Sequence, residues 1–179
     1  MIGGTVTLHS VVRGLCVSAV LMLHGGQASG VSAARDAARA ADMVAIEKLR
    51  QQDIAATLSR DPVALTDLWT DDAIRIGVGQ PADVGRKAIG ASNDRQMANK
   101  SFKVLSYISE VKDFTFLDGG WAVEWRTFTA SYVESPGAEV KQIRGTVLGV
   151  WKRLPDGSWK AFRGMGGTES PIAGKAGGS

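Results

Sequence analysis

Three consecutive segments decide the fold of this chain: WAVEWRTFTASYVE (residues 121–134), EVKQIRGTVLGVWKRL (139–154) and SWKAFRGM (158–165). Val, Thr, Phe, Tyr and Trp are frequent in them, and these residues favour a pleated, half-buried strand. The connecting tripeptides, Ser-Pro-Gly (135–137) and Pro-Asp-Gly (155–157), are typical of turns, because proline presets φ and glycine tolerates positive φ. The segments therefore predict a three-stranded antiparallel meander.

The N-terminal half is predicted to be helical. Residues 31–59 are rich in Ala, with Arg, Glu, Gln and Leu among the other residues and no Pro or Gly, which favours one long amphipathic helix. Its expected apolar face consists of Ile46, Leu49, Ile54 and Leu58, and its expected polar face mostly of Asp42, Glu47, Arg50 and Gln51. This helix is expected to cover the concave side of the sheet.

Shorter elements are predicted between the long helix and the meander. Asp61 as N-cap and Pro62 in the first position begin a second helix. Its expected apolar side is Ala64, Leu65, Leu68 and Trp69, and residues 70–73 end it. A short strand over 74–78 and a third helix over 85–99 follow. In residues 101–117 the apolar alternation slips from one parity to the other and returns, which predicts a long strand bent by a bulge.

Together these elements predict one α+β domain over residues 31–167. A strongly curved sheet, mixed or antiparallel, is expected to wrap around the long N-terminal helix and the two shorter helices and so to form a cone. Gly, Ala and Ser dominate residues 168–179, which predicts a flexible tail.

Residues 1–30 have the order of a secretory signal: a positive charge at Arg13, ten apolar or small residues (14–23), then small residues suited to a signal peptidase (24–30). The apolar run is well short of the roughly 20 residues of a membrane-spanning helix. We therefore expect export with cleavage, a periplasmic or secreted protein, and no stable membrane anchor. A lipid-modified Cys16 is the weaker alternative, since residues 13–15 do not resemble a lipoprotein cleavage box.

Cleavage would change the chemistry open to the protein. Cys16, His9 and His24 are the only cysteine and histidines of the chain, and all three lie in the predicted signal. A mature chain without Cys or His excludes His-activated nucleophiles, Cys/His zinc sites and disulfides. We expect no metal and no cofactor, and proton transfer then falls to Asp, Glu, Tyr, Lys or water. The net charge of +3 is spread along the chain, so no nucleic-acid partner is expected.

One face of the 121–134 strand carries the main candidate chemistry. Glu124, Arg126 and Phe128 share this face because alternate strand residues point the same way. Glu124 can be a base inside the cone with Arg126 as a ligand anchor, or both can belong to a structural ion pair with Arg144 or Lys152 across the sheet.

The opposite face of that strand carries Trp121, Val123 and Trp125, either as pocket walls or as a core or dimer surface. Tyr107 and Asp113 are an even number of residues apart on the bent strand, so they can form a hydroxyl and acid pair on one face, provided that the bulge leaves both on the same face. Asp71 and Asp72 are interpreted as helix-ending residues, since two adjacent carboxylates alone are a poor metal site.

Five motifs resemble those of the SnoaL-like branch of the nuclear transport factor 2-like superfamily: LWTDDAI (68–74), GRKAI (85–89), RGT (144–146), VWKR (150–153) and DGSWK (156–160). Their order and spacing agree with that branch over roughly residues 41–167. They are specific for a fold and hardly for a function.

The resemblance implies a cone-shaped α+β domain with a pocket between helices and sheet, and often a dimer through the outer face of the sheet. It also implies acids on the strands that face the pocket in enzymatic relatives. One departure is Gly164, where many relatives carry an Asp. The candidate catalytic residues are Glu124, Asp113 and Tyr107, and the candidate ligand-binding residues are Trp69, Arg126, Phe128, Arg144 and Arg163.

Three functional hypotheses follow. The first is an exported domain that binds a small, largely apolar molecule in its cone. The second is an isomerase, cyclase or hydrolase that uses a pocket carboxylate as base. The third is a non-catalytic dimerisation or adaptor module whose cone is filled by its own side chains.

The predicted signal can be tested by mass spectrometry of the protein recovered from periplasm or medium. We expect a new N-terminus between Gln27 and Ala34, because signal peptidase cleaves after small residues that follow the apolar run. An intact Met1 on the protein in the cytoplasm would contradict the prediction.

Overall fold

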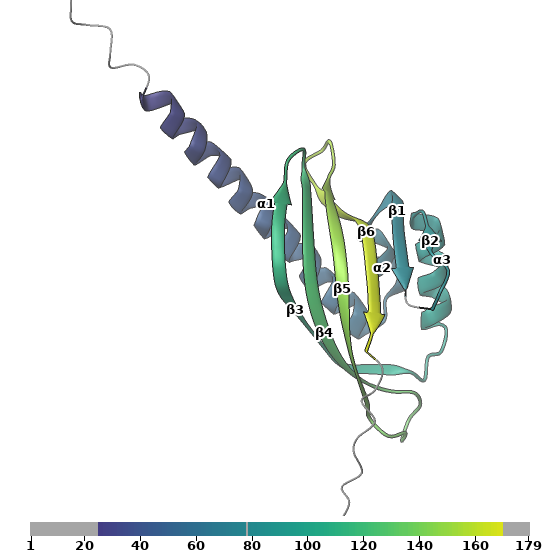
Figure 1. Cartoon of the computed structure of the whole chain (residues 1–179). Helices are drawn as coiled ribbons and strands as arrows, with labels where there is room; N and C mark the ends of the chain where they lie inside the picture. The colour runs from purple at the N-terminus through teal and green to yellow at the C-terminus, as the bar shows by residue number, and fades with distance from the viewer. Residues whose placement is uncertain (1–24, 78, 170–179) are drawn as a thin grey trace, which may run out of the picture. The chain divides into compact units, whose positions relative to one another are not determined.

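The computed structural model describes residues 25–77 and 79–169 (Figure 1). It has two compact units, residues 1–39 and 40–179. The described part of the first unit is the beginning of helix α1 (Gly25–Ser59), so most of the predicted signal, residues 1–24, lies outside the described residues. Of the predicted tail only Thr168 and Glu169 are described. In the described part of the chain, no helix has the length and hydropathy needed to cross a membrane.

The second unit contains a curved, unclosed sheet of six strands in the order β2-β1-β6-β5-β4-β3. Their bounds are β1 (Trp69–Gly77), β2 (Asp83–Val84), β3 (Lys103–Leu117), β4 (Trp121–Val133), β5 (Lys141–Arg153) and β6 (Trp159–Thr168). Neighbouring strands are antiparallel except β1 and β6, which are parallel. The predicted α+β fold with a mixed, curved sheet is confirmed, and β4, β5 and β6 are the predicted meander.

The helices agree with their predicted order. In α2 (Pro62–Asp67) the N-cap is Asp61, whose carboxylate accepts hydrogen bonds from the backbone amides of Val63 and Ala64. The third helix is α3 (Arg86–Met97). One boundary prediction was wrong: Trp69 and residues 70–73 belong to strand β1, whereas Trp69 was expected on the apolar side of the second helix and residues 70–73 at its end. Pairing of Trp69 with Ala161 of β6 outweighs its local helical pattern.

Strand β3 contains the predicted irregularity. Its register with β4 shifts between Val104 and Ser106 and again between Val111 and Asp113. Each bulge adds a residue to one strand and turns the following side chains to the other face. Tyr107 therefore pairs with the buried Ala130, whereas Asp113 pairs with the exposed Trp125.

The apolar core lies between α1 and the inner face of the sheet. It is built from Ile46 of α1, Ala122 of β4, Trp151 of β5 and Trp159 of β6. The indole Nε1 of Trp159 donates a hydrogen bond to Asp42 Oδ1 at 2.9 Å. This core anchors the part of α1 within the second unit against the sheet.

Candidate functional site

Matched positions on α1 and β4 organise the inner face of the sheet. Residues 46, 50, 53 and 57 recur every three or four positions and share one face of α1, while residues 122, 124, 126 and 128 alternate along β4. Along both elements the first of these residues packs in the apolar core, the next two are charged, and the last lines a cavity. The helix thus places one charged side chain opposite each inward charge of the strand.

The first of these pairs joins Arg50 to Glu124. Arg50 Nε donates a hydrogen bond to Glu124 Oε2 at 2.9 Å, and Nη2 lies 2.7 Å from the same oxygen. The second contact is electrostatic, since its alignment is not that of a hydrogen bond. Glu124 is 1% exposed and Arg50 is 7% exposed. A buried carboxylate held in this way joins helix to sheet.

The second pair joins Asp53 to Arg126. Asp53 Oδ2 lies 2.8 Å from Arg126 Nη2, and Arg126 Nε lies 3.6 Å from Glu124 Oε1. Burial alone lowers the pKa of Arg126, but Asp53, Tyr107 and Glu124 outweigh burial and raise it. Four charged side chains of alternating sign therefore form one cluster, and Glu47 extends it through a contact with Arg50 Nη1 at 3.1 Å.

Tyr107 adds a neutral hydroxyl close to this cluster. Burial, followed by the negative charge of Asp53, raises the pKa of Tyr107 to about 12, although Arg126 acts in the opposite direction. The phenol thus stays protonated throughout the physiological pH range and can donate a hydrogen bond. Its ring packs against Phe128 at a centroid distance of 5.6 Å.

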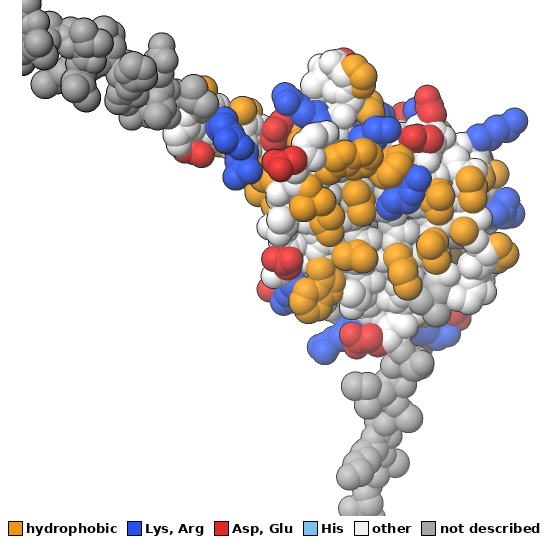
Figure 2. All heavy atoms as spheres, turned by 45° about the horizontal axis from the view of Figure 1, so that its top comes forward, with side chains coloured by type: hydrophobic (Ala, Val, Ile, Leu, Met, Phe, Trp, Pro, Cys, Tyr) orange, Lys and Arg blue, Asp and Glu red, His pale blue; other side chains and the backbone are white. Residues whose placement is uncertain are grey.

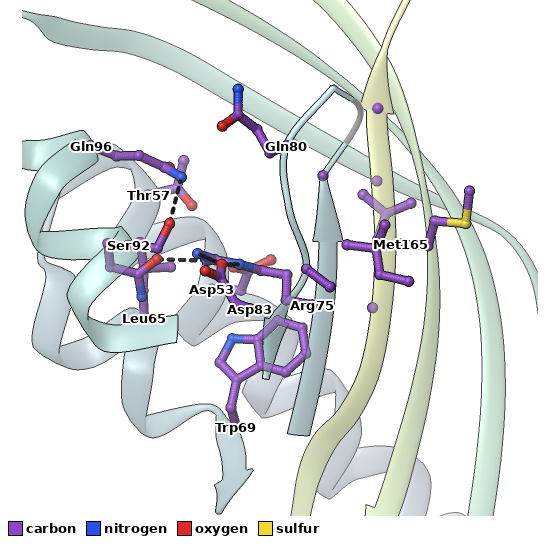
Figure 3. A pocket seen from close by; sticks show the side chains of 18 of the residues that line it. Asp53, Thr57, Leu65, Trp69, Arg75, Gln80, Asp83, Ser92, Gln96 and Met165 are labelled. Atoms are coloured by element: carbon purple, nitrogen blue, oxygen red, sulfur yellow. Dashed lines mark hydrogen bonds and ion pairs between the residues drawn. The ribbon is translucent and has the colours of Figure 1, made fainter. Parts of the chain in front are cut away.

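A cavity of about 820 Å³ opens beside the second ion pair. The side chains that give it apolar walls are Leu65, Trp69, Met97, Phe128 and Val147. Those that give it polar walls include Asp53, Thr57, Arg75, Asp83, Asn93 and Arg126. Figure 3 shows Arg75 reaching from β1 toward α3, with the Trp69 indole below it, while Met165 points away toward the other face of β6. The volume is in the range of small-molecule sites.

A polar network fixes the wall of the cavity that β1 and α3 form. Arg75 pairs with Asp83 Oδ2 through Nη2 at 2.8 Å and donates from Nη1 to Asn93 Oδ1 at 2.6 Å. Asn93 donates in turn to the Thr66 hydroxyl at 3.0 Å. Because Asn93 is buried and hydrogen-bonded on both sides, β1, β2, α2 and α3 are held in one arrangement.

The absence of a side chain at Gly164 allows Trp69 to lie over β6. A Cβ atom at Gly164 would be 2.6 Å from Trp69 Cη2, too close for any other residue unless the indole moves. Gly164 is the position at which the resemblance implies an Asp in relatives. The indole of Trp69 occupies the space that such a carboxylate would need, so the carboxylates near this cavity come from other elements.

The predicted site residues fall into separate places. Trp69, Arg126 and Phe128 line the large cavity. Glu124 lies deeper, and its partner comes from α1 instead of the predicted Arg144 or Lys152. The Tyr107 and Asp113 pair is not assembled, because the bulge after Val111 leaves Asp113 exposed on the outer face while Tyr107 is turned inward.

Two predicted ligand-binding arginines lie away from the large cavity. Arg144 is exposed and pairs in register with Thr129 on the outer face. The guanidinium of Arg163 lies 3.5 Å from the centroid of the Phe162 ring and donates to the backbone carbonyls of Phe162 and Asp72. Arg163 is thus engaged by protein groups and does not reach into the large cavity.

Sequence analysis missed Arg50, Asp53, Arg75, Asp83 and Asn93. Arg50 was assigned to the polar face of its helix, yet it is buried. A charged residue adds nothing to the apolar pattern from which buried positions are predicted. The inward position of Arg50 follows from its pairing with Glu124 on β4, which is 74 residues away in sequence. In residues 25–77 and 79–169 no group of three or more His, Cys, Asp or Glu side chains is arranged to hold a metal ion.

No family model and no curated protein sequence matches the chain. Solved structures do match. A ketosteroid isomerase-like protein from Erwinia carotovora atroseptica SCRI1043 has a TM-score of 0.62 and 20% identity, covering 72% of this chain and 96% of its own. A protein of the nuclear transport factor 2-like family from Streptomyces avermitilis has a TM-score of 0.59 and 18% identity, covering 73% and 98%.

A hexachlorocyclohexane dehydrochlorinase of type 3 from Novosphingobium barchaimii LL02 has a TM-score of 0.61 and 20% identity, covering 78% of this chain and 95% of its own. The chain has the nuclear transport factor 2-like fold. The resemblance that the five sequence motifs indicate is therefore confirmed at the level of the fold. On this nuclear transport factor 2-like scaffold, the function depends on the side chains of the cavity.

The buried charge cluster predicts a large stability effect at Glu124. In Glu124→Gln, Arg50 and Arg126 keep their charges but lose the carboxylate between them, so the free energy of unfolding should fall by about 3 kcal/mol. Urea denaturation measures the change. In the control, Glu134→Gln, only an exposed pair with Lys141 is lost, and the change should stay within about 0.5 kcal/mol. Equal losses in both variants would refute the structural role of Glu124.

Proposed function

We propose that this protein binds a small, largely apolar molecule in the large cavity, with a polar group of the ligand directed at Asp53 and Arg126. The observation that carries the proposal is a cavity of about 820 Å³ in which the Asp53–Arg126 ion pair lies beside aromatic and aliphatic walls. Such a mixture of apolar walls and a few fixed polar groups is typical of ligand sites. The order of residues 1–30 supports a place of action in the periplasm or outside the cell.

The walls favour a flat or aromatic ligand body. Trp69 and Phe128 supply two aromatic side chains, and Val147 lies on the neighbouring strand β5. Aromatic walls gain most from contact with an extended apolar surface. At the polar end, Arg126 offers donors and Asp53 accepts, so a hydroxyl or carbonyl group on the ligand matches the pair. A cavity of this size argues against the adaptor hypothesis in which the cone is filled by side chains.

Acid–base catalysis is the second candidate function, and one observation favours it. Asp53 Oδ2 is buried and makes no aligned hydrogen bond with any described residue, although it faces Arg126 at 2.8 Å. A carboxylate that lines a cavity and keeps a free lone pair can accept a proton from a bound ligand. Asp53 replaces Glu124 and Asp113 as the proposed base, because Asp53 lines the large cavity, whereas Glu124 lies outside its lining and Asp113 is exposed on the outer face.

Ligand binding is tested with three probes that share one apolar body: 2-naphthol, naphthalene-2-sulfonate and naphthalene. We expect saturation-transfer NMR to show 2-naphthol bound most tightly, because only its hydroxyl matches the neutral Asp53–Arg126 pair. In Trp69→Ala the dissociation constant for 2-naphthol should rise about tenfold, equivalent to ~1.4 kcal/mol of lost contact.

The matched control is Trp125→Ala, which removes an indole from the outer face of the sheet and should leave the dissociation constant unchanged. Binding of none of the probes, or equal weakening in both variants, would refute the proposed site.

We also propose that two copies associate through the outer face of the sheet. Four side chains form one cross-strand row there: Ile76, Met165, Leu148 and Trp125. Each is between 42% and 55% exposed. Figure 2 shows hydrophobic side chains gathered on one face of the molecule. The adjacent row contains Thr127 and Thr146, and charged residues join these rows at the β3 edge of the sheet, where Asp113 pairs with Trp125 and Glu110 with Thr127.

The proposed dimer predicts a matched pair of outcomes in sedimentation velocity. The wild-type chain should sediment as a dimer, and Leu148→Glu should sediment as a monomer, because the interface would bury an unpaired carboxylate. Val140→Glu places the same charge on an exposed residue outside the strands and should remain dimeric. A monomeric wild type, or a dimeric Leu148→Glu, would contradict the proposal.

A further inference from the structure

A second, much smaller cavity of about 70 Å³ lies beside the buried charge cluster. Its walls include Trp69, Glu124, Arg126, Gly149 and Trp151. Trp69 and Arg126 also line the large cavity, so the two spaces share a wall. The small cavity is thus set behind Trp69, next to the polar end of the proposed ligand site.

Polar atoms of the cavity walls are buried without protein partners. Trp151 is 5% exposed, and among the described residues no group accepts a hydrogen bond from its Nε1. Arg126 Nε is likewise a buried donor without a hydrogen-bond acceptor in the described chain. Buried donors in folded proteins almost always find an acceptor, either a protein group or ordered water. Two such donors at one cavity point to a polar occupant.

The size and charge of the cavity select the occupant. A cavity needs roughly 10–15 Å³ to hold one water, so a cavity of about 70 Å³ admits ordered water and is too small for the ligand of the large cavity. The charged residues that line the cavity balance, because Arg126 and Arg163 are positive whereas Asp53 and Glu124 are negative. A neutral occupant is therefore favoured over an anion or a cation.

We propose that the small cavity is a water-binding site in which ordered water accepts a hydrogen bond from Trp151 Nε1 and donates to the Glu124 carboxylate. Gly149 makes room for this water. A Cβ atom at position 149 would lie 3.4 Å from Glu124 Cγ and 3.6 Å from Glu124 Oε1, inside the space between the carboxylate and β5. The water hydrates the charge cluster from behind and leaves the other side of Asp53 and Arg126 open to the large cavity.

The site is independent of the ligand proposal, since it depends only on the walls of the small cavity. The proposed partners of the water, Trp151 and Glu124, line the small cavity and are absent from the lining of the large one.

The test uses the full chain labelled with ¹⁵N at its tryptophan indoles. We expect the Trp151 indole proton to show a nuclear Overhauser effect to long-lived water, and a crystal structure at 1.5 Å or better to show water at 2.7–3.2 Å from Trp151 Nε1. Gly149→Ala should remove the effect by filling the space, while the indole remains. Trp151→Phe should remove the density of the bound water, whereas Trp125→Phe on the outer face should retain it.

A dry cavity, or a protein acceptor within hydrogen-bond distance of Trp151 Nε1, would overturn the proposal. An unchanged Overhauser effect in Gly149→Ala would also overturn it, because the water would then lie elsewhere. The wild-type measurements decide the question even if a variant fails to fold.

Discussion

The charge cluster between α1 and β4 is the interaction on which the inner face of the sheet depends. Arg50 binds Glu124 and Asp53 binds Arg126, so charges of opposite sign meet at successive levels of helix and strand. Buried charges are costly unless each has a partner, and a shift of the helix by one residue would separate both pairs. The cluster thereby fixes which face of α1 is turned to the sheet. We infer that the charge cluster fixes the alignment of α1 against β4 more than it adds to the net stability of the fold.

The cavity follows from this register and from two local features. Asp53 and Arg126 end the charge cluster at the cavity, and Phe128 continues the same face of β4 as an apolar wall. Gly164 leaves the surface of β6 free, so that Trp69 can lie across it and separate a large space from a small one. Side-chain identity at a few positions therefore converts a common fold into a site with aromatic walls beside the Asp53–Arg126 ion pair.

Local rules predicted much of the fold. The two turn tripeptides delimited the meander, the slip in alternation predicted the bent strand, and Asp61 with Pro62 marked the start of α2. Long-range contacts escaped prediction. The strand character of Trp69 depends on parallel pairing with β6, and the inward position of Arg50 depends on Glu124 of a distant strand. Three predicted site residues line the cavity, whereas Asp53, one of its carboxylates, has no local signal that distinguishes it from a solvent-facing helix residue.

The most direct test of the account is a crystal structure of the full chain purified from its native host without removal of bound molecules. If the large cavity is a ligand site, we expect electron density for a small molecule that contacts Trp69 and places a polar atom within hydrogen-bond distance of Asp53 or Arg126. A large cavity closed by the protein's own side chains, or a ligand bound only on the outer face of the sheet, would contradict it.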